Sequence, residues 1–194
     1  MIEVQITEEM VEIAKQKSRE MGKLRNSILK GEGNVSGFIG EQIALQVLGG
    51  EWANREGCSY QYDMILPDGR TVDVKTKQRG VAPRPHYNCS VSNFNPDQKC
   101  DLYGFVSVLK NREGEYLKGW FLGTIPKQEF MDRATFATQG THDPSNNFNT
   151  PASCYNLTIE ELQNVQGHDN GVLCLLYTSP SPRDATLSRM PSSA

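Results

Sequence analysis

The sequence predicts an α/β (α+β) fold in which one central mixed β-sheet is flanked by helices. Three observations predict it. Residues 37–48 are apolar over most of a helical circumference, residues 60–77 contain two strand-like runs joined by a turn, and residues 101–123 contain two more such runs. A helix this apolar has to be largely buried, so we expect it to cover one face of the sheet.

The composition fits one domain with its own core. The chain has 194 residues, of which 37% are hydrophobic and 22% are charged, enough for a single folded unit. We expect that unit to span residues 1–170, with its core at about 36–123. The net charge of −3 argues against binding to nucleic acid by bulk charge alone, so such binding would depend on local basic clusters.

Two classes of protein are not expected. No run of about 18 apolar residues occurs, so we expect no membrane-spanning segment and no membrane partner. The five cysteines are odd in number and contain no CxxC pair, which argues against a zinc site. Reduced thiols predict a cytoplasmic location, the host cytoplasm if the protein is phage-encoded.

The last segment, residues 171–194, differs from the rest of the chain. Serine and proline dominate it, and no helical or strand period follows Tyr177. It resembles translated sequencing-adapter sequence, and the alternative is a genuine disordered tail. We therefore leave it out of the fold prediction.

Two helices are predicted before the hairpin. Residues 7–22 form the first, between an N-cap threonine and a terminal glycine. Ser36 is the expected N-cap of the second, and Gly49-Gly50 closes it. Glu41 shares the face of apolar residues on this second helix. A buried carboxylate is costly unless something pairs with it, so Glu41 needs an explanation beyond packing.

The central hairpin is predicted over residues 60–66 and 70–77. Pro67-Asp68-Gly69 supplies its turn, because proline fixes φ and glycine can adopt a positive φ. The remaining predicted elements are a strand at 86–92, strands at 101–110 and 115–123, a short helix beginning at Pro126, a long loop at 134–153, an edge strand at 155–157 and a helical turn at 158–162.

The hairpin carries the residues that point to chemistry. Side chains alternate along a strand, so Asp73 and Lys75 project from one face and Val74 from the other. Asp63, on the neighbouring strand, is expected close to Asp73. Two neighbouring carboxylates repel unless a cation lies between them, and Mg²⁺, or alternatively Mn²⁺, prefers such oxygen ligands. Such a site could activate a water beside a phosphate. Lys75 would then orient or deprotonate that water as it attacks, or stabilise charge on a phosphoryl oxygen.

The pattern Glu41, Asp63, Asp73-Val74-Lys75 resembles the PD-(D/E)XK nuclease superfamily, which has a restriction-endonuclease-like fold and includes phage and Holliday-junction-resolvase-like enzymes. The resemblance implies a Mg²⁺-dependent deoxyribonuclease, endonuclease rather than exonuclease, that hydrolyses phosphodiester bonds in DNA. It also implies that these residues are catalytic and bind metal, with the Val74 carbonyl as a further ligand. One departure is that Tyr62, not proline, precedes Asp63. Asp68 is an alternative first acid, disfavoured because it occupies the turn.

The basic residues around the hairpin are the candidates for contacts with DNA. Lys77, Arg79 and Lys30 are expected to contact the phosphate backbone, and Gln78 to position the substrate. A homodimer is a further expectation, since many enzymes of this type pair to cut both strands. Two alternatives stay open: a non-catalytic nucleic-acid-binding or scaffold protein on the same fold, and an unrelated α+β domain whose acids form ordinary ion pairs.

Overall fold

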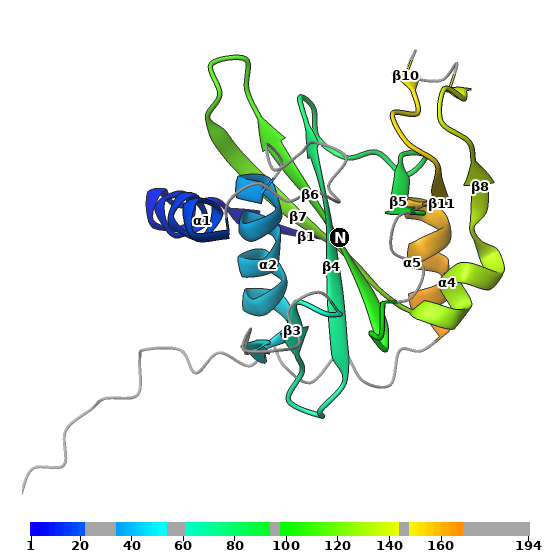
Figure 1. Ribbon diagram of the computed structural model, residues 1–194, viewed down its shortest axis with the longest axis horizontal. Coiled ribbons are helices and arrows are strands. Elements are labelled where there is room, and N and C mark those ends of the chain that lie inside the picture. The colour runs from blue at the N-terminus through cyan, green and yellow to red at the C-terminus, as the bar shows by residue number, and fades with distance from the viewer. Residues whose placement is uncertain (22–33, 54–60, 94–97, 144–147, 169–194) are drawn as a thin grey trace, which may run out of the picture.

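The structure is a computed structural model in which a six-stranded mixed sheet forms the centre of the molecule (Figure 1). It describes residues 1–21, 34–53, 61–93, 98–143 and 148–168. The strand order is β1-β7-β6-β4-β3-β2, in which β4 and β6 are parallel and the other neighbours antiparallel. The strands are β1 (Ile2–Gln5), β2 (Glu51–Trp52), β3 (Met64–Ile65), β4 (Thr71–Arg79), β6 (Leu102–Lys110) and β7 (Tyr116–Pro126).

Helices lie on both faces of this sheet, which confirms the predicted fold class. Two of them, α1 (Glu8–Met21) and α2 (Asn34–Leu48), cover one face. The opposite face carries α4 (Lys127–Arg133), α5 (Ile159–His168) and a separate three-stranded sheet (Figure 1). The strands of this second sheet, in spatial order, are β5 (Asn88–Ser92), β11 (Cys154–Thr158) and β8 (Thr135–Ala137).

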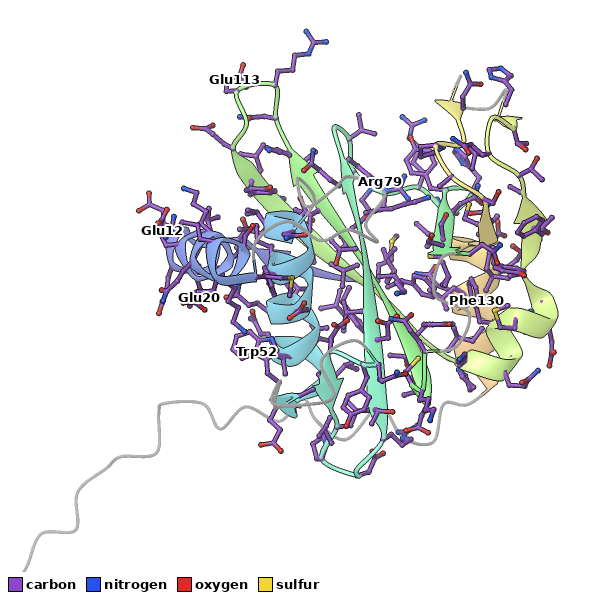
Figure 2. The ribbon with its side chains drawn as sticks, in the orientation of Figure 1. Glu12, Glu20, Trp52, Arg79, Glu113 and Phe130 are labelled. Carbon is purple, nitrogen blue, oxygen red and sulfur yellow. The ribbon has the colours of Figure 1, made fainter. Side chains whose placement is uncertain are left out.

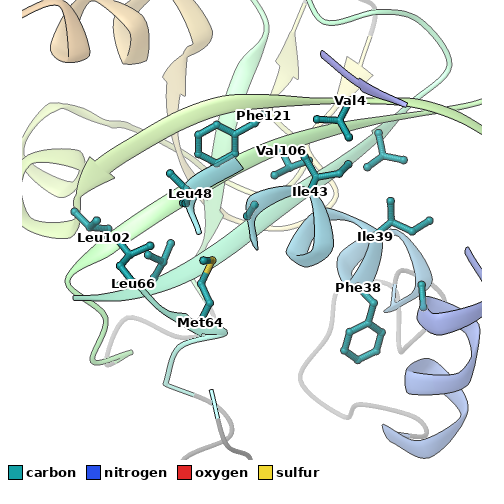
Figure 3. Packing of buried hydrophobic residues seen from close by; sticks show 14 residues of the cluster. Val4, Phe38, Ile39, Ile43, Leu48, Met64, Leu66, Leu102, Val106 and Phe121 are labelled. Atoms are coloured by element: carbon teal, nitrogen blue, oxygen red, sulfur yellow. The ribbon is translucent and has the colours of Figure 1, made fainter. Parts of the chain in front are cut away.

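Each face of the central sheet has its own hydrophobic core. The first lies beneath α2 and includes Phe38, Ile39 and Ile43 of the helix with Val72 and Val106 of the sheet (Figure 3). The second lies beneath the small sheet and is built around three aromatic residues, Tyr103, Phe105 and Phe130. Because strand β4 separates the two cores, alternate side chains of β4 face different layers.

A close contact of glycine with threonine fixes how α2 sits on β4. A Cβ atom added at Gly40 would lie 1.9 Å from the Thr76 hydroxyl oxygen and 2.9 Å from its Cβ. On the neighbouring part of the sheet, a Cβ at Gly119 of β7 would lie 2.2 Å from Cδ1 of Ile43. The two glycines let the helix approach the sheet closely, which sets the depth at which the next helical residue, Glu41, is buried.

Several local predictions are confirmed. Thr7 caps α1, because its hydroxyl accepts a hydrogen bond from the Met10 N–H at 3.2 Å. Gly49 and Gly50 close α2 with φ values of 67° and 114°. The strands at 86–92, 101–110 and 115–123 and the helix after Pro126 are also present.

Other predictions need correction. Ser36 does not cap α2 but lies buried inside it, with its hydroxyl bonded to Gln78 and Tyr116. The predicted edge strand at 155–157 is the central strand of a second sheet that was not predicted. The loop predicted at 134–153 contains β8 and a two-stranded ribbon of β9 (His142–Asp143) and β10 (Phe148–Asn149), and β1 was missed. Gly22, Lys30 and residues 171–194 lie outside the described residues.

No helix in the described part of the chain is both long and apolar enough to cross a membrane.

The Gly40 contact generates a paired prediction on one helix. Gly40→Ala should lower the free energy of unfolding by about 1–3 kcal/mol, because the new methyl group overlaps a stiff β-branched side chain. Gly37→Ala should raise it by about 0.5–1 kcal/mol, since a Cβ there meets nothing within 4 Å and alanine favours the helix. Urea unfolding followed by circular dichroism measures both. Equal effects at the two positions would contradict the close packing.

Candidate active site

The hairpin that carries the predicted site has one short strand, β3, and one long strand, β4. Strand β3 pairs with β4 only through Met64 opposite Val72 and Ile65 opposite Thr71. The turn is closed by the Gly69 N–H, which donates to the Leu66 carbonyl at 2.9 Å, with Gly69 at a φ of 87°. Beyond these two pairs, the first arm leaves β4 and continues toward β2.

Asp68 lies at the exposed tip of this turn. Its carboxylate forms an ion pair with Arg70 at 2.7 Å and accepts a hydrogen bond from the Arg70 backbone N–H at 3.0 Å. Its ion-pair partner, Arg70, belongs to the same exposed turn region. Asp63 is therefore the better candidate for the first acid of the site.

Asp63 occupies the point where the two arms of the hairpin separate. Its backbone N–H donates to the Val72 carbonyl at 2.9 Å, and its carbonyl accepts from Ala53 at 3.0 Å. Its carboxylate oxygen Oδ2 accepts the Val74 N–H at 2.7 Å. The side chain thus takes the place of a backbone carbonyl of β3 as acceptor for β4. The N–H that it accepts belongs to Val74, the residue between Asp73 and Lys75.

Buried Asp73 and partly exposed Lys75 form an ion pair on the face of β4 away from α2. Asp73 is 3% exposed, and its Oδ2 lies 2.5 Å from the Lys75 ammonium. Gln98 bridges the pair: its amide NH₂ donates to Asp73 Oδ1 at 3.1 Å, and its amide oxygen accepts from Lys75 at 3.1 Å. This cooperative arrangement fixes the position of both charged groups.

Glu41 approaches from the other layer. It is 7% exposed on α2, and its Oε2 accepts the indole N–H of Trp52 at 3.1 Å. Trp52, on β2, lies near the lower end of α2 (Figure 2). The Lys17 ammonium of α1 lies 3.4 Å from the centre of the indole ring, a cation–π contact that ties α1 to the same group.

The carboxyl group of Asp63 responds to the other two acids. The pKa of Asp63 is raised well above its ordinary value, first by burial of the carboxyl group and then by the negative charges of Asp73 and Glu41. The Val74 N–H and the Lys75 charge act in the opposite direction. Such a site is unfavourable for a second or third negative charge unless a further cation enters it.

The donor set fits a hard divalent cation. Asp73 Oδ2 is enclosed by protein, and the charged group in contact with it is the Lys75 ammonium at 2.5 Å. In the same described part of the chain, no three His, Cys, Asp or Glu side chains are arranged to hold an ion by themselves. Mg²⁺ commonly binds through one or two carboxylates and keeps several waters, so Asp63 and Asp73 suffice in number. Glu41 would then act through a coordinated water.

The remaining predicted residues are dispersed. Lys77 and Arg79 share the face of Asp73 and contact β5, whereas Gln78 projects toward α2 and accepts the Ser36 hydroxyl at 2.8 Å. Val74 pairs in register with Gly104 of β6, and its role as a carbonyl ligand stays a prediction. Lys30 is not among the described residues.

Sequence reasoning missed Trp52 and Gln98. Trp52 follows the glycines that end α2 by only two positions, so its closeness to that helix had a signal in the sequence. Gln98 had none, because it lies in a polar stretch 23 residues beyond Lys75 and reaches the site only through the tertiary fold.

No family model matches this sequence, and no curated protein matches it either.

The raised pKa of Asp63 predicts a pH-dependent stability of definite sign. Between the ordinary carboxyl pKa and the raised one, the native state binds more protons than the unfolded state, so stability falls as pH rises. In EDTA, Asp63→Asn should therefore be more stable than wild type at pH 7–8. The difference should shrink as pH falls toward about 4, the ordinary carboxyl pKa. Urea unfolding across this pH range measures the difference.

Asp101→Asn is the matched control of opposite sign. The pKa of Asp101 is lowered by hydrogen bonds from the backbone N–H and the hydroxyl of Thr71. Its stabilising effect is present above the ordinary carboxyl pKa and is lost on acidification, so this variant should be less stable than wild type at neutral pH. A stability of Asp63→Asn below wild type at pH 8 would contradict the electrostatic account.

Proposed function

We propose that the protein is a metal-dependent nuclease that hydrolyses phosphodiester bonds in DNA. The observation that carries the proposal is the position of Asp63, whose carboxyl group is close enough to Asp73 and Glu41 for both to raise its pKa, with the ammonium of Lys75 2.5 Å from Asp73. A desolvated carboxyl group with a raised pKa, close to further acids and a lysine, is typical of catalytic sites.

Each residue has a distinct task in this reaction. Asp63 and Asp73 would supply carboxylate oxygens to Mg²⁺ or Mn²⁺, and Glu41 would orient a water from the α2 side. A bound ion would lower the pKa of its water and polarise the phosphate. Lys75, positioned by Gln98, donates to the attacking water or to a phosphoryl oxygen as negative charge develops there.

The resemblance to the PD-(D/E)XK superfamily supports the same assignment. The helix glutamate, the first acid and the Asp-x-Lys strand come from α2, the residue before β3, and β4. We propose an endonuclease rather than an exonuclease on this resemblance.

A second candidate is a nucleic-acid-binding protein without catalysis. The observation that favours it is the Asp73–Lys75 contact itself, because a lysine that neutralises the acid permanently would leave a stable but inactive ion pair. Both candidates predict binding to DNA, but only the nuclease predicts that the DNA is cleaved.

The test is cleavage by the purified full-length chain of supercoiled plasmid, linear duplex, single-stranded and branched DNA, in Mg²⁺ or in EDTA. Wild type should nick closed circular DNA only in the divalent ion. Asp73→Asn and Lys75→Met should reduce the rate about 100-fold or more, because each removes charge stabilisation of the transition state. Gel electrophoresis over a time course measures the rates.

Two exposed charged residues serve as matched controls. Asp68→Asn and Lys118→Met remove an acid and a lysine whose ion pairs, with Arg70 and Glu3, lie on the surface, so cleavage should be unchanged. Metal-dependent cleavage at the wild-type rate by Asp73→Asn would overturn the assignment of the site. Binding of DNA without cleavage by wild type would favour the second candidate.

A further inference from the structure

A second feature of strand β4 lies beyond the acids, where β4 faces the small sheet. There, side chains of β4, β5, β6 and β7 line a small hollow that is partly open to solvent. Its floor is formed by apolar side chains of β6 and β7. The polar lining of this pocket comes from four residues of β4, Lys75, Thr76, Lys77 and Arg79, and from Asn88, Cys89 and Ser90 of β5.

The guanidinium of Arg79 is half-buried, and only some of its N–H groups donate to the described residues. Its Nε–H donates to the Ser107 hydroxyl at 2.8 Å, one Nη2–H donates to the Asn88 carbonyl at 3.1 Å, and its plane lies 4.7 Å from the centre of the Tyr87 ring. A guanidinium carries five N–H groups, so three have no protein acceptor in the part of the chain that the structure describes. These contacts fix the orientation of the group without neutralising its charge.

The pocket keeps a net positive charge from Lys77 and Arg79, whereas Lys75 is paired with Asp73. No Asp or Glu contributes to its lining. Burial raises the pKa of Cys89 to about 12, so this thiol stays neutral at physiological pH. The ammonium of Lys77 is held at the wall by the Asn88 carbonyl at 3.1 Å and the Ser90 hydroxyl at 2.7 Å. A rigid, partly desolvated set of cations is a favourable environment for an anion with several acceptor oxygens.

The pocket is continuous with the candidate active site. Lys75 belongs to both, and Arg79 lies four residues farther along the same extended strand, a distance of about 13 Å. Figure 2 shows Arg79 at the end of β4 opposite to Trp52. One DNA strand advances about 3.4 Å per nucleotide along a duplex axis, so the pocket lies within a few nucleotides of the bond to be cut.

We propose that this pocket binds one phosphate group of the substrate strand, with Arg79 as its principal ligand and Lys77 as the second. The inference rests on the proposed function for the nature of the strand. Its phosphate is either the monoester at a strand end or a diester within the strand, and the two sources share the same oxygen chemistry. A terminal phosphate would make the enzyme act at ends, and an internal one would position a continuous strand.

The test measures binding in EDTA, so it needs no catalysis. An internally labelled single-stranded 12-mer is titrated with the full-length protein by fluorescence anisotropy at several salt concentrations. Arg79→Gln should weaken binding about tenfold and reduce the slope of log affinity against log salt by about 0.7, the loss of one phosphate contact. Arg79→Lys should restore the slope, and Lys77→Gln should reproduce the loss if Arg79→Gln fails to fold.

Arg133→Gln is the matched control, because Arg133 is exposed on α4 and paired with Glu129 at 3.0 Å. The salt slope of this variant should equal that of wild type. Oligonucleotides with a 5′-phosphate, a 3′-phosphate or only hydroxyl ends separate the two sources. A preference for one phosphorylated end that Arg79→Gln abolishes supports the terminal phosphate, and a lowered slope without end preference supports the internal one.

The proposed phosphate binding is overturned if folded Arg79→Gln has the affinity and salt slope of wild type. If Arg79→Gln does not fold, the same result in Lys77→Gln overturns it. Failure of wild type to cleave DNA in Mg²⁺ overturns the proposed function instead, and the binding result is independent of it.

Discussion

The hydrogen bond from the Val74 N–H to the Asp63 carboxylate is the contact on which the site depends. Strand β3 pairs with β4 over two residues only, so the next N–H of β4 on that side has no backbone acceptor from β3. A buried N–H needs a partner, and the carboxylate supplies it. The cost is that Asp63 is then desolvated beside Asp73, which raises its pKa. Hairpin geometry and active-site electrostatics therefore have one origin.

The depth of the third acid has a different origin. Gly40 permits α2 to contact Thr76 closely, and Glu41 follows Gly40 directly in the helix. Its carboxylate is consequently buried, and Trp52 satisfies one of its oxygens. A backbone feature thus places both of these acids. For Asp63 it is a strand that ends early, and for Glu41 it is a glycine contact.

Local sequence patterns were sufficient for much of this arrangement. Strand alternation placed Asp73 and Lys75 on one face of β4, the Pro-Asp-Gly turn placed Asp68 at the tip, and helical periodicity buried Glu41. Gln98 and the sheet of β5, β11 and β8 were not predicted, because they depend on pairings between segments distant in the sequence. Ser36 was assigned as a helix cap on residue type alone, whereas its partners Gln78 and Tyr116 are 42 and 80 residues away.

The hydrogen bond between Trp52 and Glu41 has an optical consequence. The chain contains only two tryptophans, and the other, Trp120, lies on β7, opposite Glu3 of β1. The emission of an indole depends on the charge and polarity around its ring, so a change at Glu41 alters the fluorescence of Trp52 directly. A Trp120→Phe protein would consequently carry a single tryptophan, the one whose indole is hydrogen-bonded to Glu41. Events at this site would then be visible without a labelled ligand, and in protein that performs no reaction.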